Sequence, residues 1–179
     1  MTARVDVRRT SDLSDRERTA LRALLDAAYA GDFSDDDWAH ATGGAHLIVE
    51  ADGAIVAHAA VVARTLQVGG RPLRTGYIEA AAVRPDRQGK GLGSEVMRAA
   101  GELIARDFEL GVLSTGEWHF YERLGWERWR GPTSVRRGDG AIARTPDDDD
   151  GVMILRVPLS PPIDLVAPMT CDDRPGDPW

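Results

Sequence analysis

The chain has 179 residues, of which 42% are hydrophobic and 28% charged, values that are ordinary for a globular protein and argue against wholesale disorder. Its 29 acidic residues outnumber its 22 lysines and arginines, and the net charge of -7 counts against nucleic acid as the main partner and suits a cationic ligand better. A single cysteine excludes an intrachain disulfide and a cysteine zinc cluster. We expect one domain over residues 1–179, in the cytoplasm, with neither a signal peptide nor a membrane span.

The N-terminal half predicts one strand, two capped helices and an antiparallel meander. Residues 4–9 alternate as a strand does. Ser14 and Glu17 form a capping box that begins a helix ending near Gly31, and Ser34 caps a second, short helix. The meander is expected over 46–50, 55–66 and 73–83, with tight turns at Asp52-Gly53 and Gly69-Gly70.

The C-terminal half predicts further alternation of helix and strand. Helices are expected over 91–107 and 117–124, the second closed by Gly125, and strands over 110–114, from 125 onward and over 152–159. Residues 136–151 are polar and rich in glycine, which favours a long loop. The stretch from Pro161 onward has several prolines and little periodicity, so we expect an irregular tail. This element order is typical of an α+β fold with a mixed sheet.

Residues 87–94 form a glycine-rich loop between a strand and a helix. Glycines at Gly89, Gly91 and Gly93 would let a phosphate approach the backbone, and the first-turn N–H groups of the helix would bind it. The loop alone is a weak signal, because a surface turn has the same composition. The spacing excludes a Walker loop, since no serine or threonine follows Lys90, and it also differs from the Rossmann fingerprint.

Two motifs in this order resemble the GCN5-related N-acetyltransferase superfamily. Gln88-x-x-Gly91-x-Gly93 follows a strand ending at 83–85, and the aromatic pair and glycine turn of 120–126 come about thirty residues later. The resemblance implies that family's fold, a mixed, mostly antiparallel sheet flanked by helices. It implies acetyl-coenzyme A as donor substrate and coenzyme A as product. The coenzyme contacts it implies are Ala81, Val83, Gln88, Gly89, Gly91, Gly93 and Ser94.

A narrower resemblance, to the aminoglycoside 2′-N-acetyltransferases, runs over nearly the whole chain. It is carried by the segments 31–38, 76–83, 131–134, 144–149 and 176–179, and only residues 115–120 depart from the pattern. It implies a cationic aminoglycoside as acceptor and a homodimer. The contacts it implies for the acceptor are Asp32, Asp37, Asp149, Asp177 and Trp179, with the register within the acidic run 147–150 left open. The alternatives for these acids are solvated loops or calcium ligands.

Three residues are candidates for the chemistry of acetyl transfer. Glu79 interrupts an apolar strand, and a carboxylate there needs a reason, since burial without a partner is costly. We expect it to act as general base through water and to contact the acceptor; the alternative is an edge-strand charge. The amide of Ala81 is the candidate oxyanion donor and Tyr121 the general acid for the thiolate, the alternative for Tyr121 being a packing role. Ser114 is a candidate for positioning substrate.

The remaining signals bear on rival functions. The histidines at 40, 46, 58 and 119 show no metal spacing, so no metal site is expected, and His58 is expected to be a hydrogen-bonded core residue. The same fold could acetylate another cationic amine, such as a metabolite or peptide. It could also serve as a non-catalytic acyl-coenzyme A sensor, against which Glu79 and Tyr121 argue.

Overall fold

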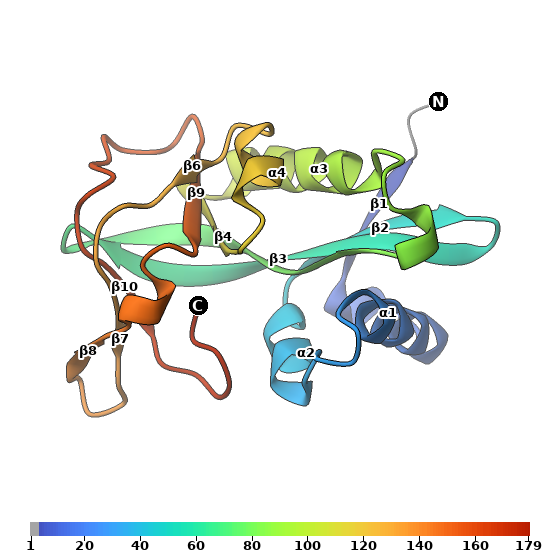
Figure 1. The fold of residues 1–179 in the computed structure, drawn as a ribbon, viewed down its shortest axis with the longest axis horizontal. Coiled ribbons are helices and arrows are strands. Elements are labelled where there is room, and N and C mark those ends of the chain that lie inside the picture. Colours follow the sequence, from blue (N-terminus) through green and yellow to red (C-terminus); the bar gives the residue numbers. More distant parts are fainter. Residues whose placement is uncertain (1–3) are drawn as a thin grey trace. The chain divides into compact units, whose positions relative to one another are not determined.

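The computed structural model describes residues 4–179 and divides the chain into two compact units. Unit 1 runs up to Val62 and resumes over Ile78–Glu102. Unit 2 comprises Ala63–Tyr77 and Leu103–Trp179. Strands β3 and β4 and helix α3, which are labelled in Figure 1, each contribute residues to both units.

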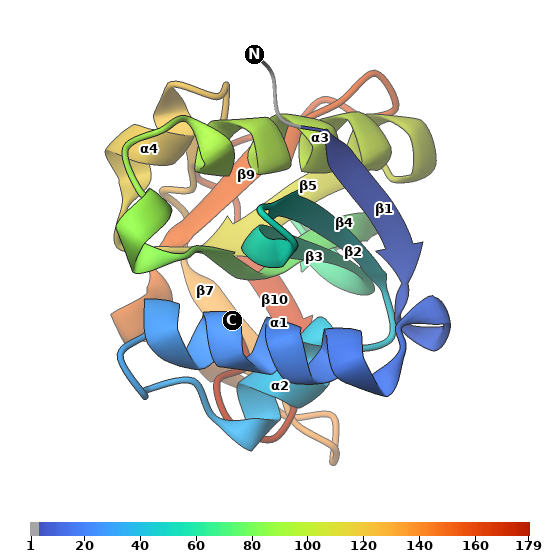
Figure 2. The same ribbon diagram turned by 90° about the vertical axis from the view of Figure 1, so that its right-hand side faces the viewer.

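Unit 1 is a sheet with helices on both faces. Its elements are β1 (Val5–Arg9), α1 (Asp15–Ala28), α2 (Asp35–Ala41), β2 (Ala45–Ala51), and the parts within this unit of β3 (Ala54–Val68), β4 (Arg71–Val83) and α3 (Leu92–Asp107). Strand β2 pairs antiparallel with both β1 and β3. Figure 2 shows α1 and α2 on one side of these strands and α3 on the other. Leu21 and Leu24 of α1 pack with Ile48 and Ile55 in a buried cluster.

Local signals placed the elements of unit 1 correctly. Ser14 and Ser34 each accept a hydrogen bond from the third helical N–H, and Glu17 and Asp37 close the two capping boxes. Satisfying these otherwise unpaired N–H groups is what lets a helix begin at a defined residue. The Asp52-Gly53 turn has positive φ angles of 53° and 74°, as a tight hairpin requires.

Unit 2 is a mixed set of strands around a hydrophobic core. Its elements are β5 (Leu110–Ser114), α4 (Trp118–Glu122), β6 (Glu127–Arg128), β7 (Thr133–Arg136), β8 (Ile142–Arg144), β9 (Val152–Arg156) and β10 (Met169–Asp172), with the parts within this unit of β3, β4 and α3. The strand order is β6-β9-β5-β4-β3-β10-β7-β8, with parallel pairing between β4 and β5 and between β10 and β7. Tyr77, Trp129 and Trp179 are among the buried residues of its core. The α+β expectation with a mixed sheet is confirmed.

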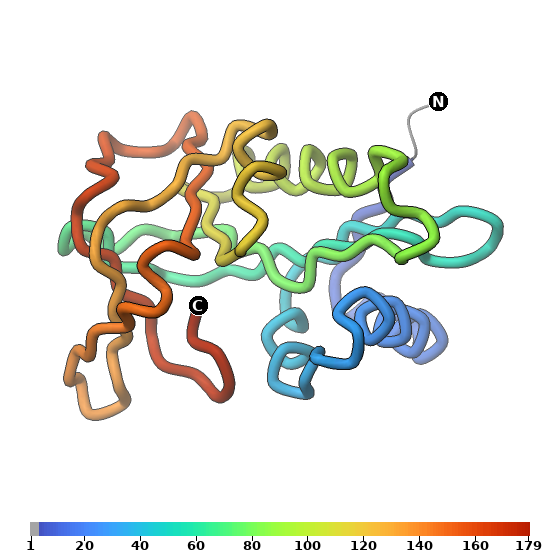
Figure 3. Tube along the Cα trace, in the orientation of Figure 1, coloured from blue at the N-terminus to red at the C-terminus, as the bar shows by residue number. Residues whose placement is uncertain are grey.

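Several expectations for unit 2 were wrong, and the strand expected from 125 onward is two strands, β6 and β7. The expected loop over 136–151 contains β8, which pairs antiparallel with β7 in a hairpin that can be followed in Figure 3. The expected irregular tail contains β10, which lies between β7 and β3, while the strand expected over 152–159 ends at Arg156. Both missed strands are short. β10 owes its conformation to pairing with residues distant in sequence, which local patterns do not register, whereas the three residues of β8 pair with nearby β7 and are too few to show a clear alternation. Within residues 4–179, no helix combines the length and the apolar character that a membrane span needs.

Candidate active site

The loop between β4 and α3, in unit 1, has the backbone geometry of an anion site. Gly89 and Gly91 have φ angles of 74° and 83°, and a Cβ built on either would meet nothing within 4 Å. Helix α3 begins at Leu92 and is 16 residues long, so its unpaired first-turn N–H groups and its dipole favour a negative charge. The Gln88 amide donates to the Val83 carbonyl at 3.3 Å and ties the loop to the end of β4. This arrangement suits a phosphate group.

The end of β4 carries an unusual backbone conformation beside the candidate base. Glu79 is half-buried, and Ala80, which follows it, has a φ of 51° that is rare for a residue other than glycine. The Ala80 carbonyl accepts a hydrogen bond from His58 Nδ1 at 2.9 Å, and the Ala81 carbonyl accepts one from the Tyr29 hydroxyl at 3.1 Å. Side chains of unit 1 thus fix the peptide groups on both sides of the Cα of Ala81. His58 is buried and hydrogen-bonded, as expected.

Two of the residues predicted to bind the acetyl-accepting substrate lie near the start of α2 in unit 1. Asp32 is exposed in the connection after α1. Asp37 is half-buried, and its Oδ2 accepts hydrogen bonds from the backbone N–H and the hydroxyl of Ser34 at 2.8 and 2.7 Å. One carboxylate oxygen of Asp37 therefore serves the helix cap.

Tyr121 and Ser114 belong to unit 2. Tyr121 is half-buried on α4, and its ring makes edge contacts with Phe120 and Trp126, with centroids 4.9 and 6.2 Å apart. Burial, and secondarily the negative charge of Glu117, raise the pKa of Tyr121 to about 12. Its phenol is therefore protonated at neutral pH and can donate a proton. Ser114 is exposed at the end of β5.

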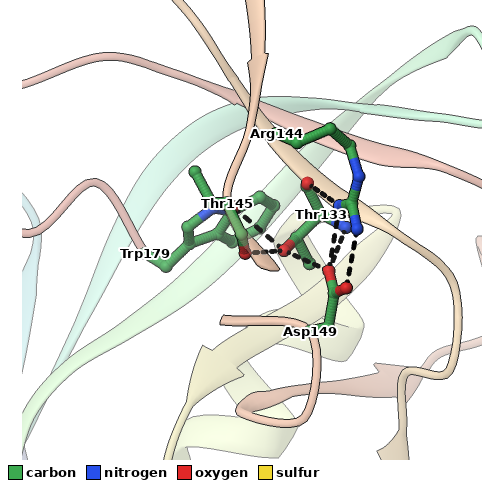
Figure 4. Close-up of polar contacts among 5 residues, drawn as sticks. All are labelled: Thr133, Arg144, Thr145, Asp149 and Trp179. Carbon is green, nitrogen blue, oxygen red and sulfur yellow. Dashed lines mark hydrogen bonds and ion pairs between the residues drawn. The ribbon is translucent and has the colours of Figure 1, made fainter. Parts of the chain in front are cut away.

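A hydrogen-bonded line anchors the end of the chain in unit 2 (Figure 4). The Trp179 indole N–H donates to the Thr145 hydroxyl at 3.0 Å, and that hydroxyl donates to Thr133 Oγ1 at 3.0 Å. Thr133 donates to Asp149 Oδ1 at 2.8 Å through its hydroxyl and at 2.7 Å through its backbone N–H. Asp149 also binds Arg144 at 2.7 Å. Trp179 is only 4% exposed, so its indole belongs to the core.

The acidic run contains a second carboxylate that sequence reasoning did not select. Hydrogen bonds from Arg144, and lesser ones from Thr133, hold the pKa of Asp149 well below its ordinary value. Burial and then the negative charge of Asp177 raise the pKa of Asp148. Asp148 and Asp177 therefore repel each other, an arrangement that a bound cation would relieve. A run of four aspartates gives no sequence signal for which member turns toward which neighbour.

Hydrogen bonds at Asp177 and Pro178 hold the C-terminal segment in place. Asp177 Oδ1 accepts a hydrogen bond from the Trp179 backbone N–H at 2.9 Å. The Pro178 carbonyl accepts one from Arg64 at 2.9 Å and one from the Cys171 thiol at 3.4 Å. The structure thus gives the segment a defined position within unit 2.

Comparisons with known proteins agree on one family. A family model described as an acetyltransferase (GNAT) domain matches residues 9–129. An aminoglycoside 2′-N-acetyltransferase of Mycolicibacterium fortuitum is 44% identical over 174 residues, which cover 95% of this chain and 89% of that protein. A GNAT family N-acetyltransferase from Escherichia coli, solved in complex with CoA, matches with a TM-score of 0.67 at 16% identity over 96% of this chain and 91% of that one. A GNAT family acetyltransferase from Brucella melitensis, in complex with acetyl-CoA, matches with a TM-score of 0.59 at 19% identity over 90% and 93%.

Proposed function

The chain belongs to the GNAT acetyltransferase family, and from that premise we propose that it transfers an acetyl group from acetyl-coenzyme A directly to an amine of an aminoglycoside. The observation that carries the acceptor class is the 44% identity, over 95% of this chain, to an aminoglycoside 2′-N-acetyltransferase. Acetyl-coenzyme A is the donor and coenzyme A the product.

The glycine loop of unit 1 binds the pyrophosphate of the donor in this proposal. Backbone N–H groups from Gln88 to Ser94 donate to it. Gly89 and Gly91 adopt positive φ angles and have no side chains that would block the phosphate. Gly93 lies in the first turn of α3, and Ala81 and Val83 line the path of the donor along the end of β4.

The transfer itself uses three groups in sequence. The acceptor enters as an ammonium ion and loses a proton to water held by Glu79, which leaves a neutral amine. The amine nitrogen attacks the thioester carbonyl, and the Ala81 N–H stabilises the oxyanion that forms. Collapse of this intermediate breaks the carbon–sulfur bond, and the Tyr121 hydroxyl protonates the departing thiolate. The attacking nitrogen, which became positively charged on attack, loses its second proton through water to the Tyr121 phenolate, which restores the hydroxyl and leaves a neutral amide. The Tyr121 phenol keeps its proton at neutral pH, as this role requires, although the burial that raises its pKa makes it a weaker acid than an exposed tyrosine.

Carboxylates bind the cationic acceptor in this proposal. They are Asp32, Asp37 and Glu79 from unit 1 and Asp177 from unit 2, while Ser114 positions the bound sugar. From the run 147–150 we choose Asp148 over Asp149, because Asp149 is occupied by Arg144 and Thr133 whereas Asp148 lies in the field of Asp177. Trp179 contributes by holding Asp177 through its N–H, since its indole is buried.

The proposal extends to assembly and role. The two units act as one N-acetyltransferase domain, the enzyme works in the cytoplasm as a homodimer, and acetylation confers antibiotic resistance. Light scattering on the purified protein tests the dimer. Growth of a sensitive bacterium that expresses the chain, in the presence of an aminoglycoside, tests resistance.

Mass spectrometry tests the reaction. An aminoglycoside incubated with acetyl-coenzyme A and the protein should gain one acetyl group, and fragmentation should locate it on the 2′ amine. A simple diamine, run in parallel, should react far more slowly. Equal rates on both would indicate a different cationic amine as substrate, and binding of acetyl-coenzyme A without transfer to either would indicate a sensor.

A further inference from the structure

Four groups of unit 1 form a continuous hydrogen-bonded line that ends at the unusual peptide of β4. Thr10 Oγ1 lies 2.8 Å from His46 Nε2, and His46 Nδ1 lies 2.9 Å from His58 Nε2. His58 Nδ1 in turn lies 2.9 Å from the Ala80 carbonyl oxygen. Both imidazoles are buried, with 0% and 1% of their surface exposed. Each ring therefore uses both of its nitrogens within the protein.

The direction of every hydrogen bond in this line follows from its last acceptor. A carbonyl oxygen can only accept, so His58 Nδ1 carries the proton. In a neutral ring the other nitrogen then accepts, which requires a proton on His46 Nδ1 and leaves His46 Nε2 to accept from the Thr10 hydroxyl. The Gly43 backbone N–H donates to that hydroxyl at 2.9 Å. The protons all point the same way, from Gly43 toward Ala80.

The surroundings keep both rings neutral, as this direction requires. Burial, and then the positive charge of Arg18, lower the pKa of His46 to about 4. Burial, and then His46 itself, lower the pKa of His58 to about 3, against the opposing effect of the hydrogen bond to Ala80. At neutral pH each ring therefore holds one proton.

We propose that His58, supported by His46 and Thr10, is a positioning residue that orients and polarises the Ala80–Ala81 peptide for acetyl transfer. The Ala80 carbonyl and the Ala81 N–H belong to one planar, trans peptide unit and point in opposite directions. A donor fixed on the carbonyl therefore fixes the direction of the N–H. Ala80 occupies the left-handed region, with a φ of 51°, so this orientation depends on the surroundings that hold it.

Besides orienting the Ala80–Ala81 peptide, the hydrogen bond from His58 also polarises it. Hydrogen bonds in a chain strengthen one another, because each donation makes the next donor more acidic. Donation from His58 to the Ala80 carbonyl draws electron density from the peptide nitrogen and makes the Ala81 N–H a stronger donor. The catalytic part of this inference rests on the oxyanion role proposed above for Ala81, where a stronger donor stabilises the transition state more than the ground state.

The hydrogen-bond line is tested first in the ligand-free protein. ¹⁵N NMR of the wild-type protein at pH 7 should show both His46 and His58 in the neutral form with the proton on Nδ1. In His58→Phe the backbone ¹⁵N resonance of Ala81 should move, because its peptide carbonyl loses a donor. In His58→Asn, whose side-chain amide can occupy the place of Nδ1, that resonance should return toward its wild-type position. A proton on Nε2 of either ring would overturn the line.

Kinetics then test its catalytic consequence. His58→Phe should lower kcat about tenfold, less than the loss of a whole oxyanion donor, with the KM for acetyl-coenzyme A within about twofold of wild type. His58→Asn should recover most of that loss. Leu47→Ala, a buried change on β2 with no hydrogen bond to the line, controls for lost stability and should leave kcat unchanged. If His58→Phe does not fold, Thr10 at the other end of the line provides the same test. Thr10→Val removes the hydroxyl and should lower kcat, whereas Thr10→Ser keeps it and should not.

The outcomes separate this inference from the proposed function. A wild-type protein that transfers no acetyl group would overturn the proposed function and, with it, the catalytic role of the line. A wild-type protein that transfers acetyl while His58→Phe, or Thr10→Val in its place, keeps full kcat would overturn the positioning role alone. A loss of kcat that the conservative variants restore supports it.

Discussion

Units 1 and 2 each contain a line of side-chain hydrogen bonds that holds a proposed site residue, but the two lines end on different kinds of group. In unit 1 the line begins at Thr10 and ends on the neutral carbonyl of Ala80. In unit 2 the line begins at Trp179 and ends on the carboxylate of Asp149, which is also paired with Arg144. The first line fixes a backbone peptide and the second fixes a segment of chain.

In the proposed reaction both units contribute side chains, and unit 1 also contributes backbone. Unit 1 would supply the N–H groups of the glycine loop and of Ala81, together with the carboxylates of Asp32, Asp37 and Glu79. Unit 2 would supply the Tyr121 hydroxyl and the carboxylates of Asp148 and Asp177. The line of unit 2 ends on the Asp149 carboxylate, which stays ionised at neutral pH and therefore keeps the hydrogen bonds that hold the C-terminal segment. The first line should therefore be sensitive to protonation and the second to salt.

The largest expected effect is that of Tyr121→Phe in unit 2. Removing the phenolic hydroxyl removes the proposed proton donor and should lower kcat by roughly 10²–10⁴-fold. Affinity for either substrate should change little, because phenylalanine keeps the ring contacts with Phe120 and Trp126. Steady-state kinetics with acetyl-coenzyme A and an aminoglycoside measure this loss, and near-UV circular dichroism checks the packing. Wild-type turnover would assign Tyr121 to packing and leave His58 of unit 1 with the larger kinetic effect.

The next effect concerns the acidic tail of unit 2. Asp177→Asn should raise the KM for the aminoglycoside by about tenfold, the lower limit for one lost hydrogen bond between charged groups. Asparagine keeps an oxygen that can accept from the Trp179 N–H, so the tail should stay in place. The effect should shrink in high salt. Asp164→Asn, another exposed acid of unit 2 with a similar local hydrogen bond, is the matched control. Equal KM changes in both variants would remove Asp177 from the site.

Much of unit 1 could be predicted from the sequence because its signals are local. A capping box spans four residues and a tight turn two, so the sequence around Ser14 and Asp52-Gly53 contains the whole determinant. The sequence predicted that His58 would be a hydrogen-bonded core residue, but it did not predict which groups it would bond. These hydrogen bonds depend on the pairing of β2 with β3 and on the conformation of Ala80, although a histidine in each of two apolar strands was a usable signal.

Unit 2 was harder to predict because its determinants are distant in sequence. Strand β10 takes its place from pairing with β7, some thirty-five residues earlier in the chain, as the register of Met169 opposite Thr133 shows. The choice between Asp148 and Asp149 depends on Arg144, Thr133 and Asp177, and adjacent identical residues cannot reveal it. The catalytic assignments of Glu79 and Tyr121 came from family motifs, and they stay predictions until the variants are measured.

The backbone character of unit 1 is tested at Gly91. Gly91→Val should weaken binding of acetyl-coenzyme A by about tenfold, because a branched side chain would stand between the phosphate and the N–H groups that bind it. Calorimetry on the folded variant measures this. Gly140→Val places the same side chain at a positive φ of 85° in the turn between β7 and β8, where nothing lies within 4 Å of an added Cβ, so it shares the backbone strain and should keep coenzyme affinity. Unchanged affinity in Gly91→Val would argue against this loop as the coenzyme site.

A matched pair of substitutions compares the two lines directly. Thr133→Val removes a buried hydroxyl that donates to a carboxylate and should cost about 1.5–3 kcal/mol of unfolding free energy. Thr10→Val removes a hydroxyl that donates to a neutral imidazole and should cost about 0.5–1.5 kcal/mol. Denaturant unfolding of both variants at low and high salt measures these values. A larger loss for Thr10→Val would reverse the comparison.

Unit 1 should also respond to mild acid. The folded-state pKa values of His46 and His58, about 4 and about 3, lie below the ordinary value of 6.5, because burial disfavours the charged form. The unfolded chain therefore binds more protons below pH 6.5, so the stabilisation is fully present above that pH and is lost as the pH falls toward 4 and then 3. Each imidazole contributes a loss of up to about 1.4 kcal/mol per pH unit.

Asp149 behaves differently, and this makes the two lines separable. Its folded-state pKa is depressed, so its contribution is present above the unfolded value of 3.8 and is lost only at lower pH. Between pH 7 and pH 5 the loss should therefore come from unit 1. Unfolding free energies measured at both pH values should differ less in His58→Asn than in wild type, because that variant has one buried imidazole fewer. An equal difference in the two proteins would mean that His58 does not titrate as its burial requires, and the neutral line of unit 1 would lose its distinction from the charged line of unit 2.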